Sequence, residues 1–145
     1  MSLPARISLV TLGVADVARA KAFYSALGWP VAADDGDDFC VFDTRGPVLA
    51  LYPAHSLAED AGNPDAGTPE SAGVRSALAI NVGSVEEVDA GLAAAEAAGG
   101  RITRAAERMF WGGYSGYFAD PDGHAWEVAY NPHWTLDEHG RPTLR

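Results

Sequence analysis

The sequence has one cysteine, no long apolar run and few basic residues, and each shortage excludes a class of protein. Cys40 alone cannot form an internal disulfide or a thiolate-rich metal site, and a buried structural thiol is expected. No stretch approaches the ~18 consecutive apolar residues of a membrane span. The first ten residues lack the basic segment and apolar stretch of a signal peptide. These absences predict a soluble, cytoplasmic protein.

Basic residues are outnumbered two to one, with ten Lys and Arg against twenty Asp and Glu and a net charge of −10. A nucleic-acid binder needs a basic surface to displace phosphate counterions, and an anionic membrane surface attracts basic segments. Neither partner is therefore expected. The 145 residues, 48% of them hydrophobic, have the length and composition of one globular domain with a core of its own.

The two halves of the chain repeat one order of predicted elements. In the first half, a β-branched run at 6–14 precedes Asp16, a helix N-cap, and a helix over 17–27. In the second, a strand near 78–82 precedes a capping box that begins at Ser84, and the helix ends at Gly99. Three short extended segments follow each helix, near 31–34, 39–43 and 48–52 and near 101–107, 114–119 and 124–130. Each half is predicted to be strand–helix–strand–strand–strand, in the α+β class.

These signals predict a single domain over 1–145, with one module at about 6–53 and another at about 76–132. The segment 54–75 is rich in Ala, Gly, Pro and acidic residues, which indicates a linker, with a mobile lid as the alternative. The tail at 133–145 contains Trp134 and Leu136, which would pack on the domain or on a partner subunit.

The turn that starts at Asp120 predicts the pairing of the last two strands. Asp-Pro-Asp-Gly suits a three-residue hairpin with a bulge, which places Tyr117 opposite Glu127 and Phe118 opposite Trp126. A two-residue turn would shift this pairing by one. Strand alternation then puts Phe118 and Trp126 under a helix and the other pair on the opposite face.

Two stretches resemble the vicinal oxygen chelate superfamily of glyoxalases, bleomycin-resistance proteins and extradiol dioxygenases. They are LVTLGVADVARAKAFYSALGW near the start and FADPDGHAWEVAYNP near the end. The resemblance covers roughly Ile7 to Pro132. It implies two βαβββ modules that form a curved mixed sheet around a central cavity, with the helices outside. It does not imply one activity, because this fold hosts many chemistries.

The resemblance also implies a divalent metal held by up to four side chains, one on the first and one on the last strand of each module. The matching positions are Leu9, Ala50, Ala77 and Glu127. Three of these four side chains are hydrocarbons, and one carboxylate does not hold a divalent cation. No two histidines have the spacing of metal ligands, the four being His55, His124, His133 and His139. We predict no metal and no other cofactor.

Glu127 is the one ionisable group with a specific place in the expected cavity. It could recognise an amine or hydroxyl or act as a catalytic general base. The alternative is a carboxylate that reaches water or pairs with an arginine such as Arg104 or Arg108. Further ligand-binding candidates line the expected cavity or a glycine turn at its mouth: Thr11, Asn81, Trp111, Tyr114 and Tyr117. The aromatic residues of that turn could instead pack in a dimer interface or against the edge of the sheet.

The leading hypothesis is a metal-free protein that binds a cationic or aromatic organic ligand, like the drug-sequestering branch of the superfamily. The alternative is a lyase, isomerase or dioxygenase of that superfamily, either metal-dependent or with Glu127 as general base. Exposed strand edges, together with the resemblance, predict a homodimer. A monomer whose tail closes on its own sheet is the alternative.

Overall fold

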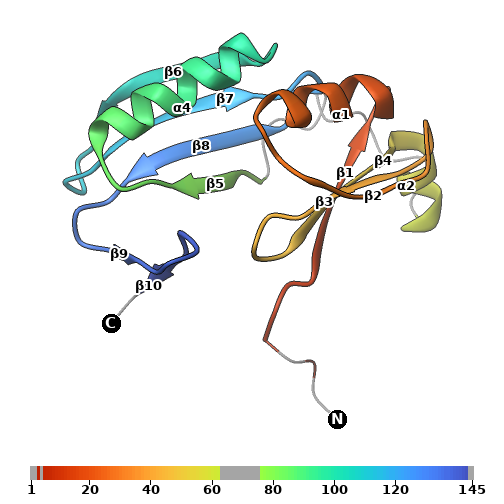
Figure 1. Cartoon of the computed structure of the whole chain (residues 1–145), viewed down its shortest axis with the longest axis horizontal. Coiled ribbons are helices and arrows are strands. Elements are labelled where there is room, and N and C mark those ends of the chain that lie inside the picture. The colour runs from red at the N-terminus through yellow and green to blue at the C-terminus, as the bar shows by residue number, and fades with distance from the viewer. Residues whose placement is uncertain (1–2, 4, 63–75, 144–145) are drawn as a thin grey trace. The chain divides into compact units, whose positions relative to one another are not determined.

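The computed structural model describes residues 3, 5–62 and 76–143 (Figure 1). Internal contacts divide the chain into two compact units, Met1–Ala66 and Gly67–Arg145. Among the described residues, no helix is long and apolar enough to cross a membrane. Each unit contains one βαβββ module, so the predicted α+β class and the repeated element order are confirmed.

The first unit begins with β1 (Leu9–Val14), α1 (Val17–Ala26) and β2 (Val31–Asp34). It continues with β3 (Cys40–Phe42), β4 (Val48–Pro53) and α2 (Ala54–Asp60). The strands form one sheet in the order β1-β4-β3-β2, with β1 and β4 parallel and the other pairs antiparallel. The sheet is therefore mixed, with β1 and β2 at its edges.

Helix α1 covers one face of this sheet and packs against β4. The helix starts where predicted, because the carboxylate of Asp16 accepts a hydrogen bond from the backbone N–H of Arg19. Tyr24, which is fully buried, packs its ring 5.3 Å from that of Trp29 and 5.8 Å from that of Phe42. These aromatic contacts give the first unit a core of its own.

The second unit consists of β5 (Leu78–Asn81), α4 (Val85–Ala97), β6 (Arg101–Arg108), β7 (Tyr114–Ala119) and β8 (Ala125–Tyr130). A short hairpin, β9 (Thr135–Leu136) with β10 (Pro142–Thr143), follows. The main sheet has the order β5-β8-β7-β6, with β5 and β8 parallel. Helix α4 lies along one face and packs against β6, β7 and β8 (Figure 1).

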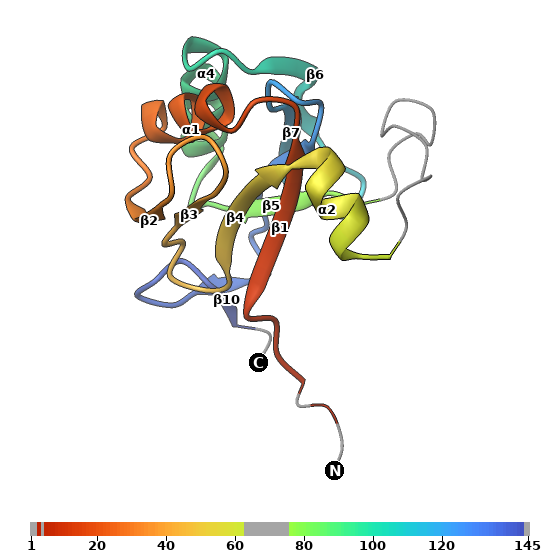
Figure 2. The ribbon, with the colours of Figure 1, turned by 90° about the vertical axis from the view of Figure 1, so that its right-hand side faces the viewer.

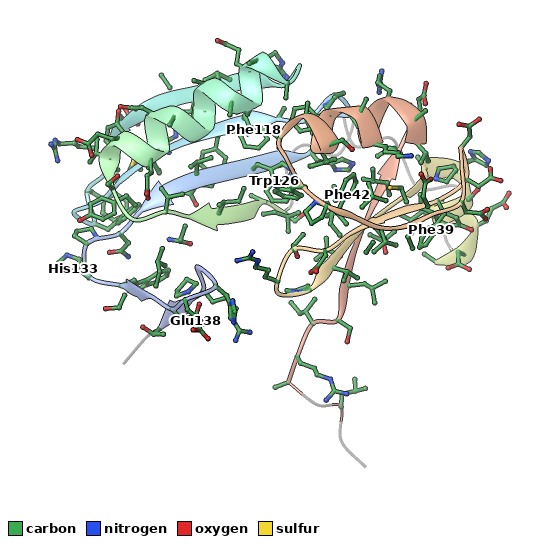
Figure 3. All side chains as sticks on the ribbon, viewed as in Figure 1. Phe39, Phe42, Phe118, Trp126, His133 and Glu138 are labelled. Atoms are coloured by element: carbon green, nitrogen blue, oxygen red, sulfur yellow. The ribbon has the colours of Figure 1, made fainter. Side chains whose placement is uncertain are left out.

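The predicted capping box opens α4. The hydroxyl of Ser84 accepts a hydrogen bond from the backbone N–H of Glu87, whose carboxylate accepts one from the N–H of Gly83. Beneath the helix, the rings of Phe118 and Trp126, both labelled in Figure 3, stack with centroids 6.2 Å apart. Both side chains are nearly fully buried and form the core of this unit.

The predicted hairpin between β7 and β8 is confirmed. Tyr117 lies opposite Glu127, and Phe118 lies opposite Trp126. Gly123 has a φ of +88° and donates its backbone N–H to the carbonyl oxygen of Asp120 at 2.9 Å. Since the pairing follows from the turn, the sequence alone sets which residues face α4.

The segment expected to be a linker begins instead with a helix, α2, which lies against β1 and β4 (Figure 2). Gly13 makes room for it, since a Cβ at that position would lie 3.2 Å from Cδ2 of Leu57. The stretch has too few apolar residues for periodicity to show, so the sequence did not indicate this helix. The remainder of the expected linker, 63–75, lies outside the described residues.

Candidate functional site

The second sheet has one face beneath α4 and an opposite face, here called the Glu127 face. Phe118, Trp126 and Val128 are buried on the α4 side, so alternation along β7 and β8 places the intervening residues on the other side. Cross-strand pairing extends this assignment to β5 and β6. The Glu127 face comprises Ala79, Asn81, Arg101, Arg104, Glu107, Ser115, Tyr117, Ala119, Ala125, Glu127 and Ala129.

Glu127 lies near the middle of this face among small side chains. Its direct cross-strand neighbours are Tyr117 on β7 and Ala79 on β5, and Ala125 and Ala129 flank it along β8. Its side chain is half-buried, and it has no hydrogen bond or ion pair with any residue that the structure describes. Alanine side chains have no polar atoms, so these neighbours offer the carboxylate no side-chain hydrogen bond. Glu127 can therefore accept hydrogen bonds from a ligand.

Arg104 does not neutralise Glu127. Its guanidinium donates hydrogen bonds to Oε1 of Glu107 at 3.0 Å and to Oγ of Ser115 at 2.7 Å. The same group lies over the ring of Tyr117, with Cζ 5.2 Å from the centroid. Arg108 lies opposite Tyr114 and makes no ion pair with Glu127. The interpretation in which Glu127 pairs with either arginine is therefore wrong.

Tyr114, a predicted ligand-binding residue, faces α4 rather than the Glu127 face. Its hydroxyl donates a hydrogen bond to Oδ1 of Asp89, on α4, at 2.7 Å. That hydrogen bond raises the pKa of Tyr114 above its ordinary value. Tyr114 and Tyr117 are three residues apart on one strand, so alternation places them on opposite faces. The structure does not bring Tyr114 together with Glu127.

The remaining predicted ligand-binding residues occupy three different places. Asn81 ends β5 on the Glu127 face, opposite Ala129. Trp111 lies in the turn between β6 and β7, where its ring packs against Gly113. Thr11 belongs to the first unit, on β1. The structure therefore brings Asn81, Tyr117 and Glu127 onto one face of one sheet.

The four positions at which the resemblance implies metal ligands do not fit a divalent cation. Leu9 lies on β1 and Ala50 on β4, whereas Ala77 precedes β5 and Glu127 lies on β8. Three of these side chains offer no oxygen, nitrogen or sulfur atom. In the part of the chain that the structure describes, no three His, Cys, Asp or Glu side chains are grouped as a metal site. Glu127 is the one donor at these positions.

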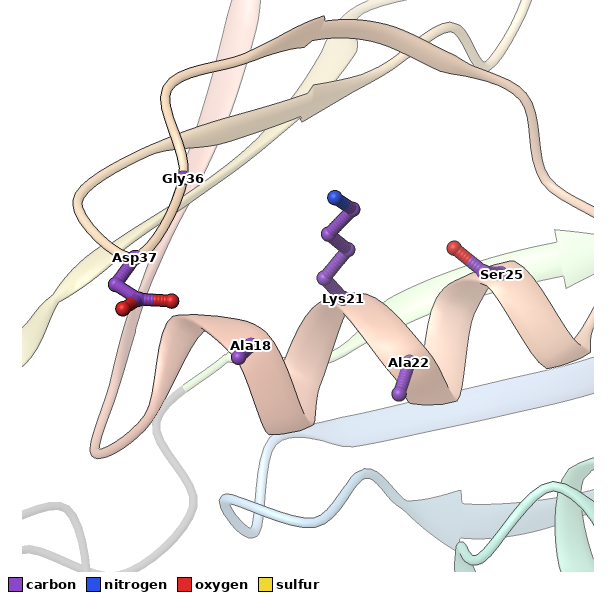
Figure 4. A pocket seen from close by; sticks show the side chains of 6 residues that line it. All are labelled: Ala18, Lys21, Ala22, Ser25, Gly36 and Asp37. Carbon is purple, nitrogen blue, oxygen red and sulfur yellow. The ribbon is translucent and has the colours of Figure 1, made fainter.

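A pocket of about 330 Å³ lies in the first unit, beside α1 and the loop between β2 and β3 (Figure 4). The ammonium of Lys21 forms an ion pair with Asp34, which raises the pKa of Lys21 and lowers that of Asp34. Asp37 adds a further negative charge to the pocket. Sequence reasoning missed this pocket, because it depends on how the loop folds toward the helix. Its lining consists of Ala18, Lys21, Ala22, Ser25, Gly36 and Asp37.

The comparisons with protein-family models and with solved structures both indicate the glyoxalase family. The family model described as Glyoxalase/Bleomycin resistance protein/Dioxygenase superfamily matches residues 6–128. Among solved structures, a glyoxalase-related enzyme from Fulvimarina pelagi is 34% identical, with a TM-score of 0.87, over 97% of this chain and 99% of that chain. A protein of unknown function from Agrobacterium tumefaciens str. C58 is 30% identical, with a TM-score of 0.68, over 90% and 97% of the two chains.

A more distant similarity concerns the fold alone. A lactoylglutathione lyase from Agrobacterium tumefaciens is 23% identical, with a TM-score of 0.65, over 90% of this chain and 96% of that chain. The search of curated proteins finds no match.

Proposed function

Because the chain belongs to the glyoxalase/bleomycin resistance protein/dioxygenase superfamily but lacks three of the four expected metal ligands, we propose that it binds a small organic amine without a metal. The observation that carries this proposal is Glu127, a half-buried carboxylate without a hydrogen-bond or ion-pair partner among the described residues. The ligand's ammonium group would supply that partner.

The surroundings of Glu127 favour a cationic ligand with a flat or apolar body. A charge-assisted hydrogen bond between an ammonium and a carboxylate is about twice as strong as a neutral one. The alanines on either side of Glu127 are apolar, and Tyr117, an aromatic residue, lies directly opposite it on the neighbouring strand. The net charge of −10 attracts cations to the protein in general.

Titration calorimetry with cationic antibiotics and aromatic amines, including 4-methylbenzylamine, tests this function. We expect binding to metal-free protein, weakened about 10- to 100-fold by Glu127→Gln, because the substitution removes the charge but keeps the shape. Glu96→Gln, on α4, is the matched control and leaves the affinity unchanged. Uniform failure of these compounds to bind, or an affinity that Glu127→Gln does not alter, would contradict the proposal.

A second candidate function uses Glu127 as a general base. The 34% identity to a protein described as a glyoxalase-related enzyme favours it. A carboxylate close to a bound substrate can accept a proton in the transition state without a metal. The same variant separates the two functions: a turnover lost in Glu127→Gln with ligand affinity retained indicates a base, whereas lost affinity indicates recognition.

We also propose that the chain forms a homodimer. β1 and β5 are edge strands of their own sheets, and unpaired edges favour association. Ile7 and Leu9, at the start of the first unit, are 68% and 53% exposed, and Trp134 is partly exposed as well. Two-fold dimers are the commonest homo-oligomers. Sedimentation at micromolar concentration is expected to show a species of twice 15.2 kDa, and a single species at 15.2 kDa would overturn this proposal.

A further inference from the structure

Three residues form a row across three adjacent strands of the Glu127 face. Arg104 on β6 lies opposite Tyr117 on β7, which in turn lies opposite Glu127 on β8. Neighbouring strands are about 4.8 Å apart, so the Cα atoms of Arg104 and Glu127 are separated by about 10 Å. The row thus carries a positive charge at one end, a negative charge at the other and an aromatic ring between them.

Arg104 extends from β6, an edge strand of the sheet, and keeps donors for a further partner. Its three hydrogen bonds go to Glu107, Ser115 and, at 3.5 Å, the sulfur of Met109. A guanidinium has five N–H groups, so two have no partner among the residues that the structure describes. The side chain is 31% exposed, which leaves it accessible.

The neighbouring Glu107 does not cancel the positive end of the row. Its side chain is 61% exposed, and water screens an ion pair at such a position. Ser115, by contrast, is fully buried beneath the guanidinium and fixes its position on the sheet. The arginine therefore has a defined place from which to bind an anionic group.

We infer that the ligand is amphoteric, an inference that rests on the proposed function. Its ammonium group binds Glu127, and a carboxylate in the same molecule binds Arg104. Arginine binds carboxylates through parallel N–H···O bonds, which adds both energy and orientation. The body of the molecule then lies between the two charged groups, beside Tyr117, whose ring has the guanidinium of Arg104 over one side. Such a row also selects against other ligands, because Glu127 repels a dianion and Arg104 repels a dication.

Three probes built on one aromatic ring test this inference by titration calorimetry. We expect 4-(aminomethyl)benzoic acid to bind at least about tenfold more tightly than 4-methylbenzylamine, which lacks the acid, and more tightly than 4-methylbenzoic acid, which lacks the amine. Arg104→Gln is expected to reduce the affinity of the amphoteric probe to that of the plain amine and to leave the plain amine unchanged. Arg108→Gln, on the same strand but opposite Tyr114, is the matched control and alters neither affinity.

The outcomes distinguish this inference from the function on which it rests. If the plain amine binds and the added carboxylate brings no gain, the amphoteric ligand is excluded and the amine site stands. If no amine-bearing probe binds, both the amphoteric ligand and the proposed amine-binding function are contradicted. A gain that persists in folded Arg104→Gln protein also overturns the inference. Because Arg104→Gln removes the hydrogen-bond partner of Ser115, Arg104→Lys, which retains the charge, is measured beside it and should keep part of the gain.

Discussion

A Trp126→Ala variant is expected to lose about 4 kcal/mol of unfolding free energy. The indole is 5% exposed and stacks on Phe118 at an interplanar angle of 3°. Truncation to alanine removes this buried apolar surface and leaves a cavity beneath α4, since the flanking strands are held by their ladders. Urea unfolding followed by far-ultraviolet circular dichroism measures the loss.

Phe110→Ala is the matched control for this substitution. Phe110 is 97% exposed in the turn between β6 and β7, so its truncation is expected to change the unfolding free energy by less than about 0.5 kcal/mol. A loss below about 1 kcal/mol in Trp126→Ala would show that the Phe118–Trp126 stack is not the core of the second unit.

A Gly113→Ala variant is expected to lose about 3 kcal/mol. A Cβ at this position would lie 1.8 Å from Cζ3 of Trp111 and 2.4 Å from the carbonyl oxygen of Tyr130. The indole can rotate away, but the carbonyl belongs to β8 and can move only if the sheet distorts. Differential scanning calorimetry should show a melting temperature lowered by about 10 °C.

Gly46→Ala is the control for the general effect of replacing glycine. Among the residues that the structure describes, nothing lies within 4 Å of a Cβ at residue 46, and its φ is not positive. The substitution should therefore be neutral or slightly stabilising, because alanine reduces the conformational entropy of the unfolded chain. Equal melting temperatures for the two variants would contradict the close approach of Trp111 and Tyr130 to Gly113.

The sequence predicted those parts of the candidate site in which backbone geometry alone decides which residues pair and which face of the sheet they occupy. The hairpin turn set the pairing of Tyr117 with Glu127, and alternation placed both on one face. The same rule applied along β7 would have excluded Tyr114, which lies three residues from Tyr117 and bonds to Asp89 instead. An aromatic residue near a glycine turn can be taken for a ligand-binding residue. The alternation of side chains along the strand is the better guide to the face on which it lies.

The sequence by itself determined the order of elements within the two βαβββ modules, the caps at Asp16 and Ser84, the faces of the strands and the hydrocarbon side chains at three expected metal positions. These properties are local, because they depend on the pleat, on capping groups a few residues apart and on side-chain chemistry. Only the tertiary structure decided the partners of Arg104. Its side chain could have reached Glu127 on the same face, and it binds Ser115, eleven residues away, and Glu107. The acceptors that a long side chain binds depend on which polar groups of neighbouring strands lie within its reach. The alternation of residues along one strand does not show this.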